Sequence, residues 1–214
     1  FDFTMSETIS FSFGENWLNY IKNIGEQRFE EAQSSLKKLL KINNLNGKSF
    51  LDIGCGSGIM SLSAIKLGAK EVVSIDVDPK SVEASQLLKE KCDVSHWQIL
   101  NDSILNETFI SHLKQYDIVY SWGVLHHTGN MWTAIKNAST LVKKDGIFCI
   151  AIYNKTWSSA FWLWFKKLYN KSNSFIKKLL VLYIMIPRMI IRLLKLKHPL
   201  KDKRGMSVYY DAID

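Results

Sequence analysis

Hydrophobic positions along the chain follow two spacings in turn, one typical of helices and one typical of buried strands. Over residues 26–42 apolar side chains recur every three or four positions, which predicts an amphipathic helix. Residues 49–53 form a short apolar run that ends in glycines, which predicts a buried strand followed by a tight loop. Beyond this loop the two patterns alternate, with strands predicted over 71–75, 96–100, 117–120 and 147–152 and helices over 59–67, 81–91, 104–113 and 131–142.

This alternation determines the predicted fold class. Short strands separated by helices of this length form right-handed crossover connections between parallel strands. We therefore predict an α/β fold, a doubly wound and mainly parallel sheet with helices on both faces. A change in composition at Asn154 indicates a boundary. The predicted parts are an N-terminal cap segment and helix over 1–47, a core over 48–153, a helical lid or interface segment over 154–206, and a C-terminal stub over 207–214.

The composition fits a packed globular protein of 214 residues, because 47% of them are hydrophobic and no low-complexity tract is present. The three cysteines, Cys55, Cys92 and Cys149, are far apart and form no CxxC pair. Neither a disulfide framework nor a zinc site of ordinary spacing is expected, and a reducing compartment fits best. Because the N-terminus also has no basic and apolar secretion signal, we expect a cytoplasmic protein that binds no metal.

The net charge of +8 is concentrated in one segment. Residues 155–204 contain thirteen Lys and Arg but a single acid, Asp202, whereas the rest of the chain carries 15 bases and 19 acids. The longest uncharged apolar run of this segment, 179–186, has eight residues and cannot span a bilayer core that needs about 20. A transmembrane helix is therefore not expected. The segment is also aromatic, with six large rings within thirteen residues: Trp157, Phe161, Trp162, Trp164, Phe165 and Tyr169.

The basic segment allows three interpretations. Arg188, Arg192 and Lys195 fall on one helical face, opposite bulky apolar residues. Such a helix fits a lid that packs on its own domain and keeps its basic face in water. It also fits a helix in a membrane interface, which would make 157–197 a peripheral membrane contact. A nucleic-acid patch is the third and least favoured interpretation.

A glycine-rich loop follows the first predicted strand of the core, in the run LDIGCGSG that ends at Gly58. In doubly wound sheets ligands bind beyond the carboxyl ends of the strands, where glycines allow close approach and the next helix offers free N–H groups. A nucleotide-like cofactor is therefore expected here. The dinucleotide fingerprint GxGxxG does not fit, because its last glycine would fall on Ile59 or on Ser61.

An acid followed by G-x-G-x-G, at Asp52, Gly54, Gly56 and Gly58, resembles the pattern of class I S-adenosylmethionine-dependent methyltransferases. The resemblance covers 48–153 and implies a Rossmann-like fold with S-adenosylmethionine as cofactor. It also implies that the loop receives the amino-acid moiety of the cofactor and that an acid ending the second strand holds both ribose hydroxyls. The residues that it places at the cofactor are Asp52, Gly54, Cys55, Gly56, Ser57, Gly58, Asp76, Val77, Asp102, Ser103 and Trp122.

Several of these assignments have a structural alternative. Asp76 matches the ribose-binding acid, or it only forms a turn before Asp78. Asp102 and Ser103 match the position of an adenine contact, or they only cap the next helix. Trp122 forms a wall beside the adenine or the sulfonium, whose charge an aromatic face attracts, or it packs in the core.

His126 and His127 follow the fourth predicted strand, in a loop that faces the methyl group and the acceptor in relatives. Methyl transfer needs an aligned acceptor and, when the acceptor is a hydroxyl, a base near neutral pKa such as histidine. The segment is similar to L-E-H of the ubiquinone-biosynthesis-type O-methyltransferases, with His127 at the histidine and His126 in place of the glutamate. His127 is therefore the candidate base and His126 the second catalytic candidate; otherwise one of them caps the helix near Asn130 and the other is exposed.

Both ends of the chain resemble parts of small-molecule methyltransferases. By this resemblance Trp17 and Asn16 line the pocket within an N-terminal cap, or they are loose surface residues. Residues 204–211 resemble a late segment of the same subgroup, after which family members add two antiparallel strands. Only eight residues follow Met206, so we expect those strands to be missing or the sheet to be completed in another way.

The combined prediction is an S-adenosylmethionine-dependent methyltransferase that modifies a hydroxyl of a small molecule. An apolar or lipid-linked acceptor fits this prediction. Two alternatives stay open. One is an RNA methyltransferase that grips phosphates with the basic segment, and the other is a non-catalytic protein that only binds the cofactor. The N/D-P-P-Y signature of many amino-group methylating enzymes is absent after the fourth strand, where the sequence reads SWGV.

Overall fold

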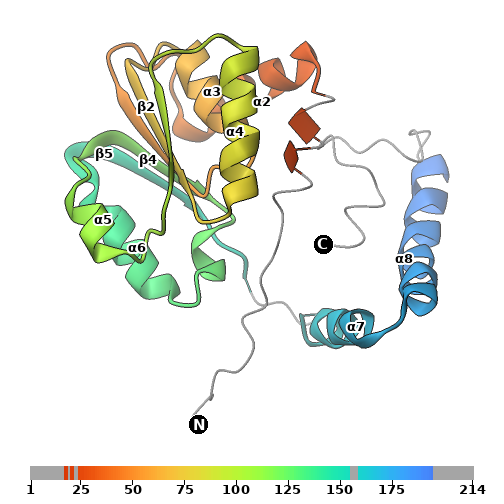
Figure 1. Cartoon of the computed structure of the whole chain (residues 1–214). Helices are drawn as coiled ribbons and strands as arrows, with labels where there is room; N and C mark the ends of the chain where they lie inside the picture. The colour runs from red at the N-terminus through yellow and green to blue at the C-terminus, as the bar shows by residue number, and fades with distance from the viewer. Residues whose placement is uncertain (1–16, 19, 22–23, 155–158, 195–214) are drawn as a thin grey trace. The chain divides into compact units, whose positions relative to one another are not determined.

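The structure is a computed structural model of the chain (Figure 1). It describes residues 17–18, 20–21, 24–154 and 159–194. The chain divides into two compact units, 1–152 and 153–214. The first unit contains the sheet, the glycine loop and the histidine pair, and it therefore determines the candidate site.

The sheet of the first unit has five parallel strands in the order β3-β2-β1-β4-β5. The first strand, β1, lies at the centre of the sheet. The next two, β2 and β3, follow on one side of it, and β4 and β5 lie on its other side. The switch point between β1 and β4 is where ligands bind in open α/β sheets. The predicted parallel sheet is confirmed, and its strands are β1 (Ser49–Ile53), β2 (Glu71–Asp76), β3 (Trp97–Asn101), β4 (Tyr116–Trp122) and β5 (Val142–Ala151).

Helices cover both faces of this sheet, as the sequence predicts (Figure 1). On one face α2 (Glu26–Leu40), α3 (Ile59–Lys66) and α4 (Pro79–Lys91) share a core with Phe50 and Tyr120 of the sheet. On the other face α5 (Glu107–Ser111), the 3₁₀ turn η1 (Leu125–His127) and α6 (Met131–Thr140) pack around Leu51, Ile75 and Val119. Alternate residues of β1 thus enter two different cores, as the two-residue period of a strand requires.

The boundary between α6 and β5 differs from the prediction. A helix is predicted over 131–142 and a strand over 147–152, but α6 ends at Thr140 and β5 already begins at Val142. Val142 pairs with Tyr116, and the register then shifts so that Ile118 pairs with Ile147. The polar residues between these two pairs form an irregular part of the strand, which periodicity alone assigns to a loop.

A second difference concerns the helix predicted over 104–113, which is only the short α5. Its N-cap is Asn106, whose Oδ1 accepts the N–H of Phe109 at 3.2 Å. Ile104 lies outside the helix because its carbonyl accepts Asn137 Nδ2 of α6 at 2.9 Å. This long-range contact decides where the helix begins.

One carboxylate joins three strands at the amino end of the sheet. Asp117 Oδ2 accepts hydrogen bonds from Ser49 N, Ser49 Oγ and Lys143 Nζ at 2.8, 2.7 and 2.8 Å. Burial alone would raise the pKa of Asp117, but the hydrogen bonds from Lys143 and Ser49 outweigh it and hold the pKa well below its ordinary value. Asp117 therefore stabilises the junction of β1, β4 and β5.

The second unit contains α7 (Ser159–Lys171) and α8 (Ser174–Leu194). The two helices bury Phe165 and Val181, and the ring of Phe165 stacks on Tyr183 with centroids 6.4 Å apart. Among the described residues no helix combines the length and the apolar character that crossing a bilayer requires. Lys195 and the stub over 207–214 lie outside the described residues, and the assignment of this unit as a lid stays a prediction.

Candidate functional site

The glycine loop lies between β1 and α3 at the carboxyl end of the sheet. It is anchored to β2, because the N–H groups of Gly54 and Cys55 both donate to Ile75 O, at 2.8 and 3.2 Å. Gly54 has a φ of 75°, and a Cβ there would come within 2.4 Å of the Val124 side chain from the loop after β4. Only glycine fits this position, because both the backbone angle and the contact exclude a side chain.

Trp17 approaches the same loop from the N-terminal segment. Gly56 has a φ of 54°, and a Cβ on it would lie 2.9 Å from Trp17 Nε1. The indole therefore lies directly against the loop backbone. This position agrees with Trp17 as a pocket residue rather than a loose surface residue, whereas Asn16 lies outside the described residues.

The other loop residues are held from the interior. Cys55 Sγ lies 3.4 Å from Ser85 Oγ, and the Ser85 hydroxyl donates to Gly56 O at 3.1 Å. Burial raises the pKa of the Cys55 thiol, so it stays protonated and fills space. Ser57 is buried, and Gly58 forms the N-cap of α3 with a φ of 74°. The first N–H groups of α3 follow directly and suit an anionic group.

Asp76 ends β2 and faces the glycine loop. Its Oδ2 accepts the N–H of Gly56 at 2.9 Å, and its Oδ1 accepts the N–H of Asp78 at 2.9 Å. Burial raises the pKa of Asp76, and these two N–H groups act in the opposite direction. Each carboxylate oxygen accepts up to two hydrogen bonds, so the residue has capacity for two further donors, as the hydroxyls of a ribose supply. The next residue, Val77, is exposed.

Asp102 lies beside Asp76 after the neighbouring strand β3. The N–H of Asp102 donates to Asp76 O at 3.2 Å. Asp102 Oδ1 accepts Ser103 N at 2.7 Å and Asn106 Nδ2 at 2.9 Å, and Ser103 Oγ accepts Leu105 N at 3.1 Å. Since Asn106 is the N-cap of α5, the alternative that Asp102 and Ser103 themselves cap this helix is wrong. Their contact with adenine stays a prediction.

Trp122 is the last residue of β4 and forms the outer end of an aromatic stack. Its ring lies 6.2 Å from Tyr120 at an angle of 9°, and Tyr120 in turn stacks on Phe50 at 5.9 Å. Half of the Trp122 side chain is exposed, whereas Tyr120 is buried. Packing in the core, the alternative considered for Trp122, is therefore wrong, and its open face is available at the carboxyl end of the sheet.

The two histidines lie together in η1, with ring centroids 4.0 Å apart. His127 is exposed, and His126 is partly buried. Burial lowers the pKa of His126 below its ordinary value, so this ring is neutral at pH 7. Neither histidine is the N-cap of α6, because Asn130 holds that position and its Oδ1 accepts the N–H of Thr133 at 3.3 Å.

Asp52 is buried beneath the loop, with only 2% of its surface exposed. Its Oδ2 accepts the hydroxyl of Ser61, which lies 2.7 Å from Ser74 Oγ, and Ser74 Oγ accepts Trp97 Nε1 at 2.7 Å. The sequence interpretation missed these three partners. The available signal was a serine at an inward position of the apolar helix α3 and another in the apolar strand β2.

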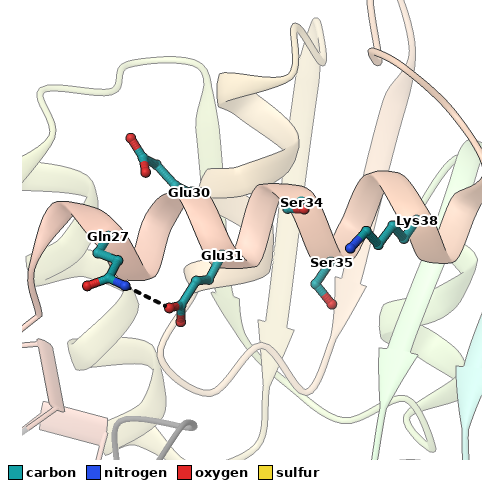
Figure 2. A pocket seen from close by; sticks show the side chains of 6 residues that line it. All are labelled: Gln27, Glu30, Glu31, Ser34, Ser35 and Lys38. Atoms are coloured by element: carbon teal, nitrogen blue, oxygen red, sulfur yellow. Dashed lines mark hydrogen bonds between the residues drawn. The ribbon is translucent and has the colours of Figure 1, made fainter.

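Two further observations concern metal-binding groups and surface hollows in the part of the chain that the structure describes. Among the described residues no group of three or more His, Cys, Asp or Glu side chains is placed to hold a metal ion. An open hollow lies on the outer surface of α2 (Figure 2). Its described lining residues are polar and come from that one helix: Gln27, Glu30, Glu31, Ser34, Ser35 and Lys38.

Comparison with known proteins identifies the family. The model of a family described as a methyltransferase domain matches residues 24–209. Together with the fold and the glycine loop, this match shows that the chain belongs to the class I S-adenosylmethionine-dependent methyltransferases.

Curated relatives match parts of the chain. A ubiquinone biosynthesis O-methyltransferase of Glaesserella parasuis is 35% identical over 118 residues, 54% of this chain and 50% of that protein. Another, of Pelagibacter ubique, is 29% identical over 65% of this chain and 58% of its own. A ribosomal protein L11 methyltransferase of Colwellia psychrerythraea is 52% identical over 52 residues, 24% of this chain and 18% of its own. The chain thus spans about half the length of the O-methyltransferases that it matches.

Solved structures agree on the fold. A Methanococcus maripaludis protein assigned to the S-adenosylmethionine-dependent methyltransferases has a TM-score of 0.56 at 17% identity, covering 70% of this chain and 68% of its own. The YcgJ protein of Bacillus subtilis has a TM-score of 0.52 at 17% identity, covering 66% of this chain and 58% of its own. At this identity the likeness shows the fold alone, and it confirms the Rossmann-like architecture.

Proposed function

We propose that this protein binds S-adenosylmethionine at the glycine loop and transfers its methyl group to a hydroxyl of a small-molecule acceptor. The fixed position of the Asp76 carboxylate carries the proposal. The N–H groups of Gly56 and Asp78 each donate to one of its two oxygens, both at a donor–acceptor distance of 2.9 Å. A carboxylate fixed at this edge of the sheet suits the two adjacent hydroxyls of a ribose. The relatives named ubiquinone biosynthesis O-methyltransferase support an oxygen acceptor.

Each group of residues at the carboxyl end of the sheet would bind a different part of the cofactor. The loop and the first N–H groups of α3 would hold the amino-acid carboxylate, and Asp76 would accept the ribose hydroxyls. Asp102 would face the adenine amino group, and the half-exposed ring of Trp122 would attract a positive charge. Bound S-adenosylmethionine would supply a methyl group on a cationic sulfur.

His127 is the proposed base that takes the hydroxyl proton of the acceptor. It is exposed and lies in η1, directly after the strand that ends at Trp122. The neighbouring His126 is neutral at pH 7, so no second positive charge opposes the proton that His127 accepts. A positioned general base contributes roughly 10²–10⁴ in rate.

The test uses methyl-labelled S-adenosylmethionine with a lipid extract in one arm and purified RNA in the other. We expect label in the lipid fraction, and we expect His127→Gln to lower its rate of transfer about 100-fold or more without changing the affinity for S-adenosylhomocysteine. His112→Gln is the matched control, because His112 is an exposed histidine whose Nδ1 lies 2.7 Å from Thr108 O on α5. Label only in RNA, or an unchanged rate in His127→Gln, would contradict the proposal.

We also propose that α8 contacts a membrane surface, which would bring the site to an apolar acceptor. Five apolar side chains follow one another at intervals of three or four residues and are 48% to 71% exposed: Phe175, Leu179, Leu182, Ile186 and Ile190. Lys178 is exposed on the same helix. An apolar stripe with basic neighbours is typical of helices that lie in an anionic membrane interface.

Sedimentation with phosphatidylglycerol vesicles tests this contact. We expect the protein to bind these vesicles more strongly than phosphatidylcholine vesicles, and the double variant Leu179→Ser with Ile186→Ser to lose most of this binding. Trp132→Ser is the control, because Trp132 is apolar and 74% exposed but lies on α6. Equal binding by the double variant, or no binding by the unmodified protein, would contradict the membrane contact.

A further inference from the structure

A buried chain of hydrogen bonds runs from β3 to β1 beneath the glycine loop. Trp97 Nε1 donates to Ser74 Oγ at 2.7 Å, Ser74 Oγ lies 2.7 Å from Ser61 Oγ, and Ser61 donates to Asp52 Oδ2. All four residues are at most 2% exposed. This series of hydrogen-bonded side chains also contacts the glycine loop, because a Cβ on Gly58 would lie 2.6 Å from the Trp97 ring.

The direction of each hydrogen bond in this series is fixed. An indole N–H can only donate, and a serine hydroxyl has one proton. The Ser61 proton is used for Asp52, so Ser74 must donate to Ser61, while Ser74 accepts from Trp97. Every proton therefore points toward the carboxylate, an arrangement that favours the ionised form of Asp52.

The surroundings of Asp52 oppose ionisation. Burial raises the pKa of Asp52 to about 7, with a further rise from the negative charge of Asp76 and an opposing effect of Ser61. Three other titratable groups lie near Asp52. Cys55 is on the glycine loop, and Tyr120 is the residue of β4 that pairs with Asp52 in the sheet. Cys149 is the neighbour of Tyr120 on the side away from Asp52. Burial raises the pKa of all three, so they stay neutral near pH 7 and leave the charge to Asp52 and Asp76.

We propose that cofactor binding is linked to a proton: Asp52 releases one proton to solvent when the cationic cofactor occupies the glycine loop. In this inference Ser61, Ser74 and Trp97 are positioning residues that orient hydrogen bonds toward the carboxylate. The inference rests on the proposed function, because it needs S-adenosylmethionine, with its sulfonium and ammonium charges, to bind at this loop. A positive charge near Asp52 favours the ionised form, so the affinity rises with pH.

Titration calorimetry of S-adenosylmethionine in two buffers with different ionisation enthalpies measures the proton directly. We expect the apparent enthalpy to differ between the buffers near pH 7. We also expect the affinity to rise between about pH 6 and pH 8, by at most tenfold per pH unit, and to level off above. Asp52→Asn should abolish both the buffer dependence and the rise.

The serine variants test the role of the chain. Ser74→Ala and Ser61→Ala remove donors toward the carboxylate, so the rise in affinity should move to higher pH. Ser63→Ala is the matched control, because Ser63 is buried on the same helix but donates to Ile59 O at 2.7 Å, and its pH profile should not move. Ser74 lies two hydrogen bonds from Asp52, behind Ser61, so Ser74→Ala keeps the test available if Ser61→Ala does not fold.

Four results would overturn the inference in whole or in part. Binding whose heat is the same in both buffers and whose affinity does not change with pH would remove the proton link while leaving the proposed function intact. A proton release that Asp52→Asn leaves unchanged would assign the proton to another group, such as Asp76, and a pH profile that both serine variants leave unchanged would remove Ser61 and Ser74 as positioning residues. No binding of S-adenosylmethionine at any pH would overturn this inference and the proposed function together.

Discussion

Asp117 and Asp76 lie at opposite ends of the same sheet and show opposite electrostatics. At the amino end, Asp117 Oδ2 accepts three hydrogen bonds, one of them from the cation of Lys143, and its pKa lies well below the ordinary value. At the carboxyl end, the hydrogen bonds described for the Asp76 carboxylate come from the backbone N–H groups of Gly56 and Asp78, and burial raises the pKa of Asp76. The first carboxylate stabilises the fold, whereas the charge of the second costs free energy.

This difference separates a structural carboxylate from a binding carboxylate. A group whose ionised form is stabilised within the chain gains little from a ligand. Another carboxylate can be fixed in position while its negative charge is only partly stabilised by the surrounding protein. Such a group is stabilised further when a ligand brings a hydrogen-bond donor or a cation. Asp76 and Asp52 are both of the second kind. Asp76 accepts the N–H of Gly56 on the glycine loop, and Asp52 accepts the hydroxyl of Ser61 on α3, the helix that follows the loop.

The largest effect is expected from Asp76→Ala. It removes the acceptor of two hydroxyls, and charge-assisted hydrogen bonds contribute about 1.5–3 kcal/mol each, so the affinity for S-adenosylhomocysteine should fall about 100-fold or more. Calorimetry measures this loss. Asp117→Ala should leave the affinity of the folded protein unchanged, and equal affinities in wild type and Asp76→Ala would remove Asp76 from the site.

Asp117→Asn should instead lower the free energy of unfolding. The loss is expected to be about 1–2 kcal/mol near pH 7, since the exposed part of the Lys143 pair is screened by solvent. Because the pKa of folded Asp117 is lowered, its stabilisation is complete above the unfolded pKa of about 4, decreases as the pH falls below that value, and disappears only below the lower pKa of the folded state. The loss caused by Asp117→Asn should therefore be smaller at pH 3 than at pH 7. Urea unfolding at pH 7 and pH 3 measures this. A variant that is equally destabilised at both pH values would contradict the ion-pair account.

A smaller effect separates two glycines with similar backbone angles. Gly56 and Gly47 have φ values of 54° and 72°, so alanine is strained at both by about 1 kcal/mol. At Gly56 the new Cβ would also displace Trp17, whereas at Gly47 nothing lies within 4 Å. Gly56→Ala should therefore weaken cofactor binding about tenfold, near 1.4 kcal/mol, and Gly47→Ala should not change it. Equal affinities in the two variants would place Trp17 outside the site.

The sequence predicted the elements that obey one strong period, because each buries one clear face. It predicted the parallel sheet and the glycine loop for this reason, whereas the role of Asp76 was implied by the family resemblance and stays a prediction. It failed at β5, where the pairing of Val142 with Tyr116 extends the strand through polar residues. It also missed the hydrogen-bond chain, since Ser61, Ser74 and Trp97 meet only once α3, β2 and β3 have packed together.

Nuclear magnetic resonance of backbone amides during titration with S-adenosylhomocysteine tests the central claim most directly. The account predicts saturable shifts of the Gly54, Gly56 and Asp78 amides, with the Ser49 and Asp117 amides at the other end of the sheet unchanged. Shifts confined to residues outside the glycine loop and the end of β2, or no shifts at saturating ligand, would contradict it.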